Sequence, residues 1–174
     1  MNTIELEKHV NSPDSSKFEG TTAVFFPIDE QWGVKLFRCE GTRDLSYNRH
    51  TTLYDMGLAP MYGPKNTLVY DSETWYGYLC EIVECCDTAV LDHYGVEHNG
   101  KCQGGDYFGL CSDDSYSDFL MENEKWGTAD VELRGRLEEE GIRFTDTHAG
   151  NWGIRKNGQP VLIDFDKGLY GVDI

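Results

Sequence analysis

Three oxygen-bearing side chains in the C-terminal part of the sequence have the types and spacing of a metal and phosphate site. Asp146 and Asn151 lie in the segment F-T-D-T-H-A-G-N, and Asp164 follows the apolar run 161–163. Carboxylate and amide oxygens are the ligands that hard cations such as Mg²⁺ prefer. Phosphoryl transfer needs such cations, together with a carboxylate that orients the attacking hydroxyl. The segment therefore predicts nucleotide chemistry.

The pattern D-x-x-x-x-N followed by D-F resembles the catalytic loop and metal-binding Asp of the protein kinase superfamily. His148 makes the loop most similar to the aminoglycoside phosphotransferase and choline kinase branch, or to phage-encoded kinases. The resemblance implies that Asp146 is the catalytic carboxylate and that His148 supports the loop. It makes Asn151 and Asp164 the Mg²⁺ ligands. Asp166 would be a third acidic ligand or a turn residue.

The resemblance also requires a lysine on an upstream strand and a turn that covers the phosphates. Lys35 in W-G-V-K-L-F-R resembles the lysine of V-A-I-K, which holds the α and β phosphates of ATP. An isolated lysine in a strand is otherwise a surface residue. Between the first strands the sequence has only Gly20, followed by Thr21 and Thr22, whose amides and hydroxyls could bind a phosphate.

The run G-Y-L-C-E-I-V-E-C-C-D resembles a strand that leads into the adenine-binding hinge of a kinase, with Glu84 and Cys86 as candidate backbone contacts. Four apolar residues could line an adenine pocket or belong to the core, and core is the preferred interpretation: Trp32, Leu36, Val83 and Ile163.

Two features depart from the family pattern. The helix expected at 42–56 contains no Glu to pair with Lys35, so Asp44, Asp55 or a bound partner would have to orient that lysine. Only residues 165–174 follow Asp164, which predicts a truncated C-lobe. A protein partner or a second copy in a homodimer is then expected to cover the truncated lobe.

The predicted fold class is α+β, with a protein kinase-like N-lobe of antiparallel sheet and one helix at 1–84 and a minimal, truncated C-lobe at 85–174. After a short polar leading element, β-rich runs at 17–28 and 31–38 predict a hairpin. A helix at 42–56 is expected to pack through Leu45, Leu53 and Met56. Two further strands, at 66–71 and 74–84, are expected around a turn at Ser72 and Glu73.

The second half is predicted to contain an irregular insert or short helix at 87–117 and a helix at 124–140. Val131, Leu133 and Leu137 are the candidate packing residues of that helix. The hairpin that follows the catalytic loop is expected to turn at Asn157 and Gly158.

The amino-acid composition limits the kinds of partner that the protein is expected to bind. The 31 Asp and Glu residues against 15 Lys and Arg residues give a net charge of -16, so direct binding to nucleic acid or anionic membrane is not expected. The acidic surplus is interpreted as a solvated surface, with an acidic docking face or DNA mimic as the alternative. The sequence shows no signal peptide or membrane span, so we expect a cytoplasmic protein, located in the host cytoplasm if a phage encodes it.

The six cysteines have irregular spacing without a C-x-x-C pair, so we expect reduced thiols. A structural zinc site is the minority interpretation, and its candidate ligands are Cys85, Cys86, His93, His98, Cys102 and Cys111.

Two functions follow from these residues. The first is an ATP- and Mg²⁺-dependent phosphotransferase that acts on a hydroxyl of a small molecule or host protein, based on Lys35, Asp146, Asn151 and Asp164 together. The second is a pseudokinase-type module that inhibits or scaffolds a partner protein, based on the reduced glycine turn and the missing helix Glu.

Overall fold

The computed structural model describes residues 2–20, 22–97, 113–146 and 148–171. The chain forms two compact units, Met1–Thr51 with Met61–Ile82, and Thr52–Pro60 with Val83–Ile174. Both units contain helices and antiparallel strands, so the fold is α+β as predicted and is compatible with a kinase-like fold.

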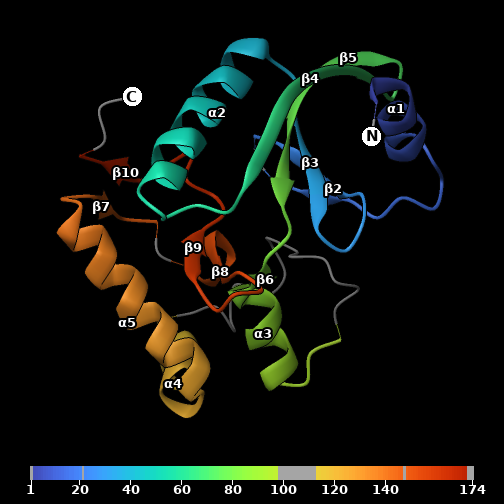
Figure 1. Ribbon diagram of the computed structural model, residues 1–174. Helices are drawn as coiled ribbons and strands as arrows, with labels where there is room; N and C mark the ends of the chain where they lie inside the picture. The colour runs from blue at the N-terminus through green and yellow to red at the C-terminus, as the bar shows by residue number, and fades with distance from the viewer. Residues whose placement is uncertain (1, 21, 98–112, 147, 172–174) are drawn as a thin grey trace. The chain divides into compact units, whose positions relative to one another are not determined.

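The first unit is built on a five-stranded antiparallel sheet with the spatial order β1-β2-β3-β5-β4 (Figure 1). The predicted order of strands, one helix and two further strands is present. A short helix, α1, precedes it, and the last turn of α2 belongs to the second unit. The elements are α1 (Thr3–Val10), β1 (Phe18–Glu19), β2 (Val24–Pro27), β3 (Trp32–Phe37), α2 (Glu40–Asp55), β4 (Tyr62–Tyr70) and β5 (Glu73–Glu81).

The sheet has an apolar cluster on each face because side chains of a strand alternate between faces. Leu6 and Val10 of α1 pack on one face, together with Phe26, Val34, Leu36, Leu68 and Trp75. The other face carries Ala23, Phe37, Tyr78 and Cys80, with Tyr47 of α2 packed against them. Leu36 is fully buried in the first cluster and is therefore a core residue.

Helix α1 also covers part of the exposed edge of β4. The Glu7 carboxylate accepts a hydrogen bond from the Val69 N–H at 2.9 Å. The Asn11 amide donates to the Val69 carbonyl at 2.8 Å and accepts from the Asp71 N–H at 3.1 Å. Side chains of α1 thus occupy the hydrogen-bonding positions that a neighbouring strand would otherwise fill.

Two turns were predicted between strands of the first unit. Gly20, which the resemblance places between the first strands, lies between β1 and β2, and its N–H donates to the Ala23 carbonyl at 2.9 Å. The β4–β5 turn lies at Asp71 and Ser72, one position before the predicted turn. Both residues have positive φ, 51° and 63°, which is the geometry of a two-residue type I′ hairpin turn.

The buried face of α2 also differs from the prediction. Leu53 is fully buried as expected, whereas Leu45 is 45% exposed. The positions that face the first unit are occupied by polar residues, because Arg43, Ser46 and His50 are buried. Apolar periodicity does not predict these buried positions, because Arg43 and Ser46 are satisfied by hydrogen bonds to the Asn66 carbonyl and the Tyr78 hydroxyl.

In its described residues, the second unit contains the last turn of α2, three further α-helices, two small sheets and one 3₁₀ turn (Figure 1). Strands β6, β8 and β9 form one sheet, and β7 pairs with β10 in the other. The elements are β6 (Glu84–Cys85), α3 (Cys86–His93), α4 (Asp113–Glu122), α5 (Glu124–Glu139), β7 (Arg143–Phe144), η1 (Ala149–Asn151), β8 (Trp152–Ile154), β9 (Pro160–Leu162) and β10 (Leu169–Tyr170).

Helix α5 packs through one face, as predicted for Leu133 and Leu137, but Val131 is 71% exposed. The buried residues of α5 also include Trp126 and Ala129. Position 131 is two residues from both 129 and 133, and a helix turns about 100° per residue, which places Val131 on the opposite side.

Strand β9, which leads into Asp164, is held by the loop that follows α2. The Leu162 N–H donates to the Leu58 carbonyl at 2.8 Å, and Leu58 is fully buried. The neighbouring Gly57 carbonyl accepts hydrogen bonds from the Arg136 guanidinium and from the Gln159 amide. These contacts fix the end of β9 within the second unit.

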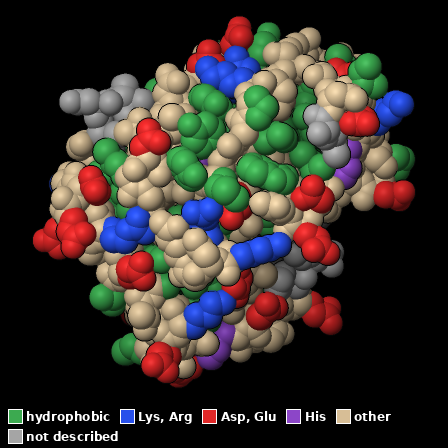
Figure 2. All heavy atoms as spheres, viewed as in Figure 1, with side chains coloured by type: hydrophobic (Ala, Val, Ile, Leu, Met, Phe, Trp, Pro, Cys, Tyr) green, Lys and Arg blue, Asp and Glu red, His purple; other side chains and the backbone are tan. Residues whose placement is uncertain are grey.

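Charged side chains of both signs lie on the face shown in Figure 2. On this face, Asp and Glu side chains are scattered and alternate with Lys and Arg side chains. Within the described ranges, the helices lack the combination of length and apolar character that a membrane span requires.

Candidate functional site

The loop between β7 and β8 carries the candidate catalytic residues. The 3₁₀ turn η1 begins after His148, whose Nδ1 accepts a hydrogen bond from the Gly150 N–H at 3.1 Å. Ala149 and Asn151 are buried, so the turn is anchored in the core of the second unit. Asp146 precedes the turn, and its side chain is 43% exposed. The loop is therefore anchored in the core and carries one partly exposed carboxylate, that of Asp146.

Asn151 connects the two predicted acidic residues of the site. Its side-chain Nδ2 donates to the Asp146 carbonyl oxygen at 2.7 Å. Its own carbonyl oxygen accepts from the N–H groups of Ile163 at 2.8 Å and Asp164 at 3.3 Å. Because the amide donates through Nδ2, Oδ1 is the end that can bind a cation. The second unit thus brings Asp146, Asn151 and Asp164 together.

His148 is next to the carboxylate of Asp146. The Gly150 N–H can donate only to an unprotonated ring nitrogen, so the neutral ring carries its proton on Nε2. That nitrogen lies 3.6 Å from Asp146 Oδ1, which is longer than a hydrogen bond. His148 therefore contacts the loop backbone through Nδ1, and its supporting role remains a prediction.

Asp164 and Asp166 lie in the turn after β9. The Asp166 N–H donates to Asp164 Oδ1 at 3.4 Å, as in an Asx turn. In the ranges that the structure describes, no three His, Cys, Asp or Glu side chains converge as a metal cluster. Mg²⁺ is commonly held by one or two carboxylates, with water and phosphate oxygens completing the shell. Asp164 with the Asn151 oxygen has the donor chemistry of such a site.

Lys35 lies on β3 in the first unit, directly opposite Phe25 on β2 and Tyr78 on β5. Its Nζ lies 5.6 Å from the centre of the Phe37 ring, a distance at which cation–π attraction operates. Gly20 and the exposed Thr22 belong to the β1–β2 turn, whereas Thr21 lies outside the described residues. The phosphate-binding roles of these residues are not tested by this geometry.

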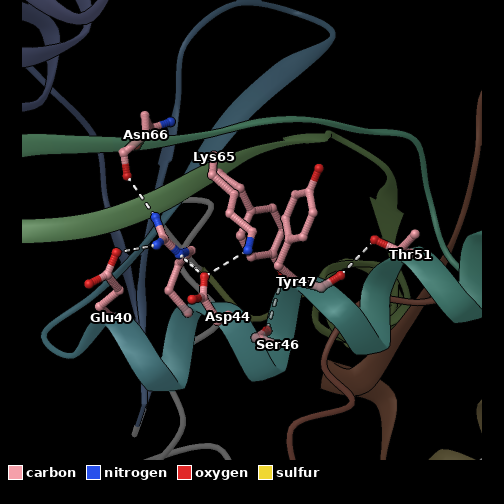
Figure 3. Close-up of polar contacts among 9 residues, drawn as sticks. Glu40, Asp44, Ser46, Tyr47, Thr51, Lys65 and Asn66 are labelled. Carbon is pink, nitrogen blue, oxygen red and sulfur yellow. Dashed lines mark hydrogen bonds and ion pairs between the residues drawn. The ribbon is translucent and has the colours of Figure 1, made fainter. Parts of the chain in front are cut away.

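Two carboxylates of α2, those of Glu40 and Asp44, bind cationic side chains of the first unit (Figure 3). Asp44 binds the Arg43 guanidinium at 2.6 Å and Lys65 of β4 at 2.8 Å. The hydrogen bond from Lys65, followed by the contact with Arg43, lowers the pKa of Asp44. Arg43 also binds Glu40 at 2.9 Å and donates to the Asn66 carbonyl at 3.2 Å. The sequence analysis missed this network because Lys65 and Asn66 are distant from α2 along the chain.

The predicted hinge contacts lie at the start of the second unit. Glu84 pairs with Ile154 in the β6–β8 ladder, and its carboxylate binds Lys125. Cys86 is the first residue of α3 and its side chain is fully buried. Backbone contact of these residues with adenine remains a prediction.

The zinc candidates are only partly described. Both ring nitrogens of His93 have partners, Glu122 at 3.0 Å and the Asn123 amide at 3.2 Å. Cys86 is buried and Cys85 is half-buried. His98, Cys102 and Cys111 lie outside the described residues.

Cys39 is predicted to be more reactive than Cys80. Cys39 is exposed before the first turn of α2, and hydrogen bonds from the N–H groups of Thr42 and Gly41 lower the pKa of its thiol. Burial raises the pKa of the Cys80 thiol to about 12. Because the thiolate is the nucleophile, iodoacetamide at neutral pH should alkylate Cys39 before Cys80.

Peptide mapping by mass spectrometry after short exposures measures the order of alkylation. The rate at Cys39 should level off at a lower pH than that of a free cysteine, because its thiolate forms at lower pH. A Cys39→Ser variant controls for assignment of the modified peptide. Equal rates at Cys39 and Cys80 would show that the amides of α2 do not stabilise the thiolate.

Comparisons with known proteins give only distant likenesses. No family model and no curated protein matches the sequence. The chain is similar to the structure of WbdD with a kinase inhibitor, at 14% identity and a TM-score of 0.37. It is also similar to an aminoglycoside phosphotransferase from Alicyclobacillus acidocaldarius, at 13% identity and a TM-score of 0.32.

These likenesses are partial. They cover 87% and 93% of this chain, which spans 32% of the first structure and 65% of the second. At such TM-scores they carry no argument about activity, so any function has to be argued from the residues themselves.

Proposed function

We propose that this protein is an ATP- and Mg²⁺-dependent phosphotransferase that acts on a hydroxyl group of a small molecule or host protein. The observation that carries the proposal is the hydrogen bonding of Asn151, which links the Asp146 carbonyl to the backbone of Asp164. A half-exposed carboxylate, an amide oxygen and a second carboxylate are thereby held within one unit. These are the groups that phosphoryl transfer requires from a protein.

Each residue has a defined task in the proposal. Asp146 orients the acceptor hydroxyl and receives its proton at a carboxylate oxygen. Asn151 and Asp164 hold the metal through side-chain oxygens, with Asp166 as a further acidic group. His148 keeps the loop in place through the Gly150 N–H. When bound, ATP would supply the phosphoryl group, and Mg²⁺ would supply the positive charge that neutralises the phosphates.

The nucleotide-binding part of the proposal rests on the resemblance of the sequence. Lys35 would bind the α and β phosphates, and the turn at Gly20, Thr21 and Thr22 would offer N–H groups and hydroxyls to them. Glu84 and Cys86 would contact adenine through their backbone groups. Residues 1–84 and 85–174 would then correspond to the two lobes, and a protein partner or second copy would bind the second of them.

A pseudokinase-type binding module is the second candidate function. The observation that favours this function is the ion pairing of the Glu40 and Asp44 carboxylates with Arg43 and Lys65. A catalytic kinase uses a carboxylate of this helix to orient the strand lysine. A module of this kind would use the fold, with or without nucleotide, to inhibit or scaffold a partner in phage–host or bacterial conflict.

Transfer of label from γ-labelled ATP separates the two functions. The protein is incubated with labelled ATP and Mg²⁺, alone and with cell lysate, beside Asp146→Ala and the exposed control Asp118→Ala. Removal of a catalytic carboxylate is expected to lower transfer by about 10²–10⁴-fold, with the control unchanged. Mg²⁺-dependent ATP binding without transfer by the unmodified protein would favour the binding module.

A further inference from the structure

The chain that follows Asp164 returns to the catalytic loop. Strand β10 pairs with β7, with Leu169 opposite Phe144. The Gly168 carbonyl accepts hydrogen bonds from the Thr145 N–H at 2.9 Å and from the Thr145 hydroxyl at 3.3 Å. The short segment 164–168 therefore connects the predicted metal ligand to the residue that precedes Asp146.

Gly168 lies directly against Asp146. A Cβ atom at position 168 would be 2.9 Å from the Asp146 Cβ, 3.0 Å from the Asp146 nitrogen and 3.0 Å from the Thr145 hydroxyl oxygen. Two of these three atoms belong to the base of Asp146, which cannot move away without moving its carboxylate. The φ of Gly168 is also positive, at +72°, which disfavours a side chain.

Asp146 is consequently fixed by one hydrogen bond and closely approached by one neighbouring residue. The Asn151 amide donates to its carbonyl oxygen at 2.7 Å, and Gly168 lies so near that a Cβ there would be 2.9 Å from the Asp146 Cβ and 3.0 Å from its nitrogen. We infer that Gly168 is a positioning residue for the Asp146 carboxylate, an inference that rests on the proposed function. Position matters because a misplacement of about 1 Å in a reacting group can lower the rate by roughly 100-fold.

The inference predicts a specific effect of Gly168→Ala. Its matched control is Gly141→Ala, since Gly141 has nearly the same φ, +69°, and a Cβ there would meet nothing within 4 Å. Both variants should show a decrease in Tm because both place alanine at positive φ, and the decrease should be larger in Gly168→Ala because its Cβ also crowds Asp146. Only Gly168→Ala should lower kcat, by about 100-fold. Its KM for Mg²⁺-ATP should stay within about twofold, because the interaction lost concerns the acceptor.

A second measurement is independent of turnover. In NMR spectra of the nucleotide-free protein, the chemical shifts of the Asp146 and Asn151 backbone amides should change in Gly168→Ala. They should stay unchanged in Gly141→Ala. If the unmodified protein transfers no phosphate, the proposed function fails while these resonances still decide whether Gly168 positions Asp146. Unshifted resonances, or an equal loss of kcat in both variants, would overturn the inference.

Discussion

Asp164→Asn is expected to remove Mg²⁺-dependent binding of ATP, whereas Asp166→Asn leaves most of it intact. Both variants lose one negative charge, so general electrostatics do not distinguish them. Loss of an outer-shell partner typically costs 10–100-fold in metal affinity, so loss of a direct ligand should cost more than about 100-fold. In the structure Asp166 contacts Asp164 Oδ1 through its backbone N–H, so we expect its carboxylate to contribute less to the metal site than that of Asp164.

Calorimetric titration of ATP, with and without Mg²⁺, measures this difference. The Mg²⁺-dependent part of the affinity should vanish in Asp164→Asn and persist in Asp166→Asn. The opposite order would make Asp166 the main metal ligand. Equal losses would show that the two carboxylates bind the metal together, and the assignment of Asp164 as main ligand would then be wrong.

Asn151→Ala is expected to lose both stability and phosphoryl transfer. Asn151 is 4% exposed, and its amide is hydrogen-bonded to the Asp146 carbonyl. Leaving a buried polar partner unsatisfied costs about 1–3 kcal/mol in the free energy of unfolding. The variant also lacks the amide oxygen proposed to bind Mg²⁺, so transfer should fall further than the stability loss explains.

Asn157→Ala is the matched control for this prediction. Asn157 lies in the exposed β8–β9 turn, where its side chain accepts a hydrogen bond from the Gln159 N–H at 3.0 Å. Urea denaturation and label transfer are measured for both variants under conditions in which both are folded. A stability loss in Asn151→Ala with normal transfer would remove Asn151 from the metal site and leave it a structural role.

The candidate catalytic loop could be identified in the sequence because its residues lie close together along the chain. Asp146, Asn151 and Asp164 occur within one short stretch, and the apolar run 161–163 identifies the strand before the last of them. The geometry between them could not be predicted. The bond from the Asn151 amide to the Asp146 carbonyl depends on the buried 3₁₀ turn, which sequence periodicity does not reveal.

Contacts between distant positions account for the other differences. The contact of Gly168 with Asp146 depends on the pairing of β10 with β7, two strands too short to leave a clear pattern. The buried polar face of α2 was not predicted. Arg43 has the residue type of an exposed position, and its burial depends on a hydrogen bond to β4 that the sequence does not show. Apolar periodicity identifies a helix, but it misplaces the buried face when that face is polar.

Helix α1 has a consequence for the behaviour of shortened versions of this chain. Its Glu7 and Asn11 side chains saturate the backbone groups of Val69 and Asp71 at the edge of β4. A polypeptide that starts after Asn11 would leave these groups open and would also uncover the apolar side chains beneath Leu6 and Val10. Open edges of this kind are templates for strand addition between molecules. The first eleven residues therefore help to keep one molecule from aggregating with the next.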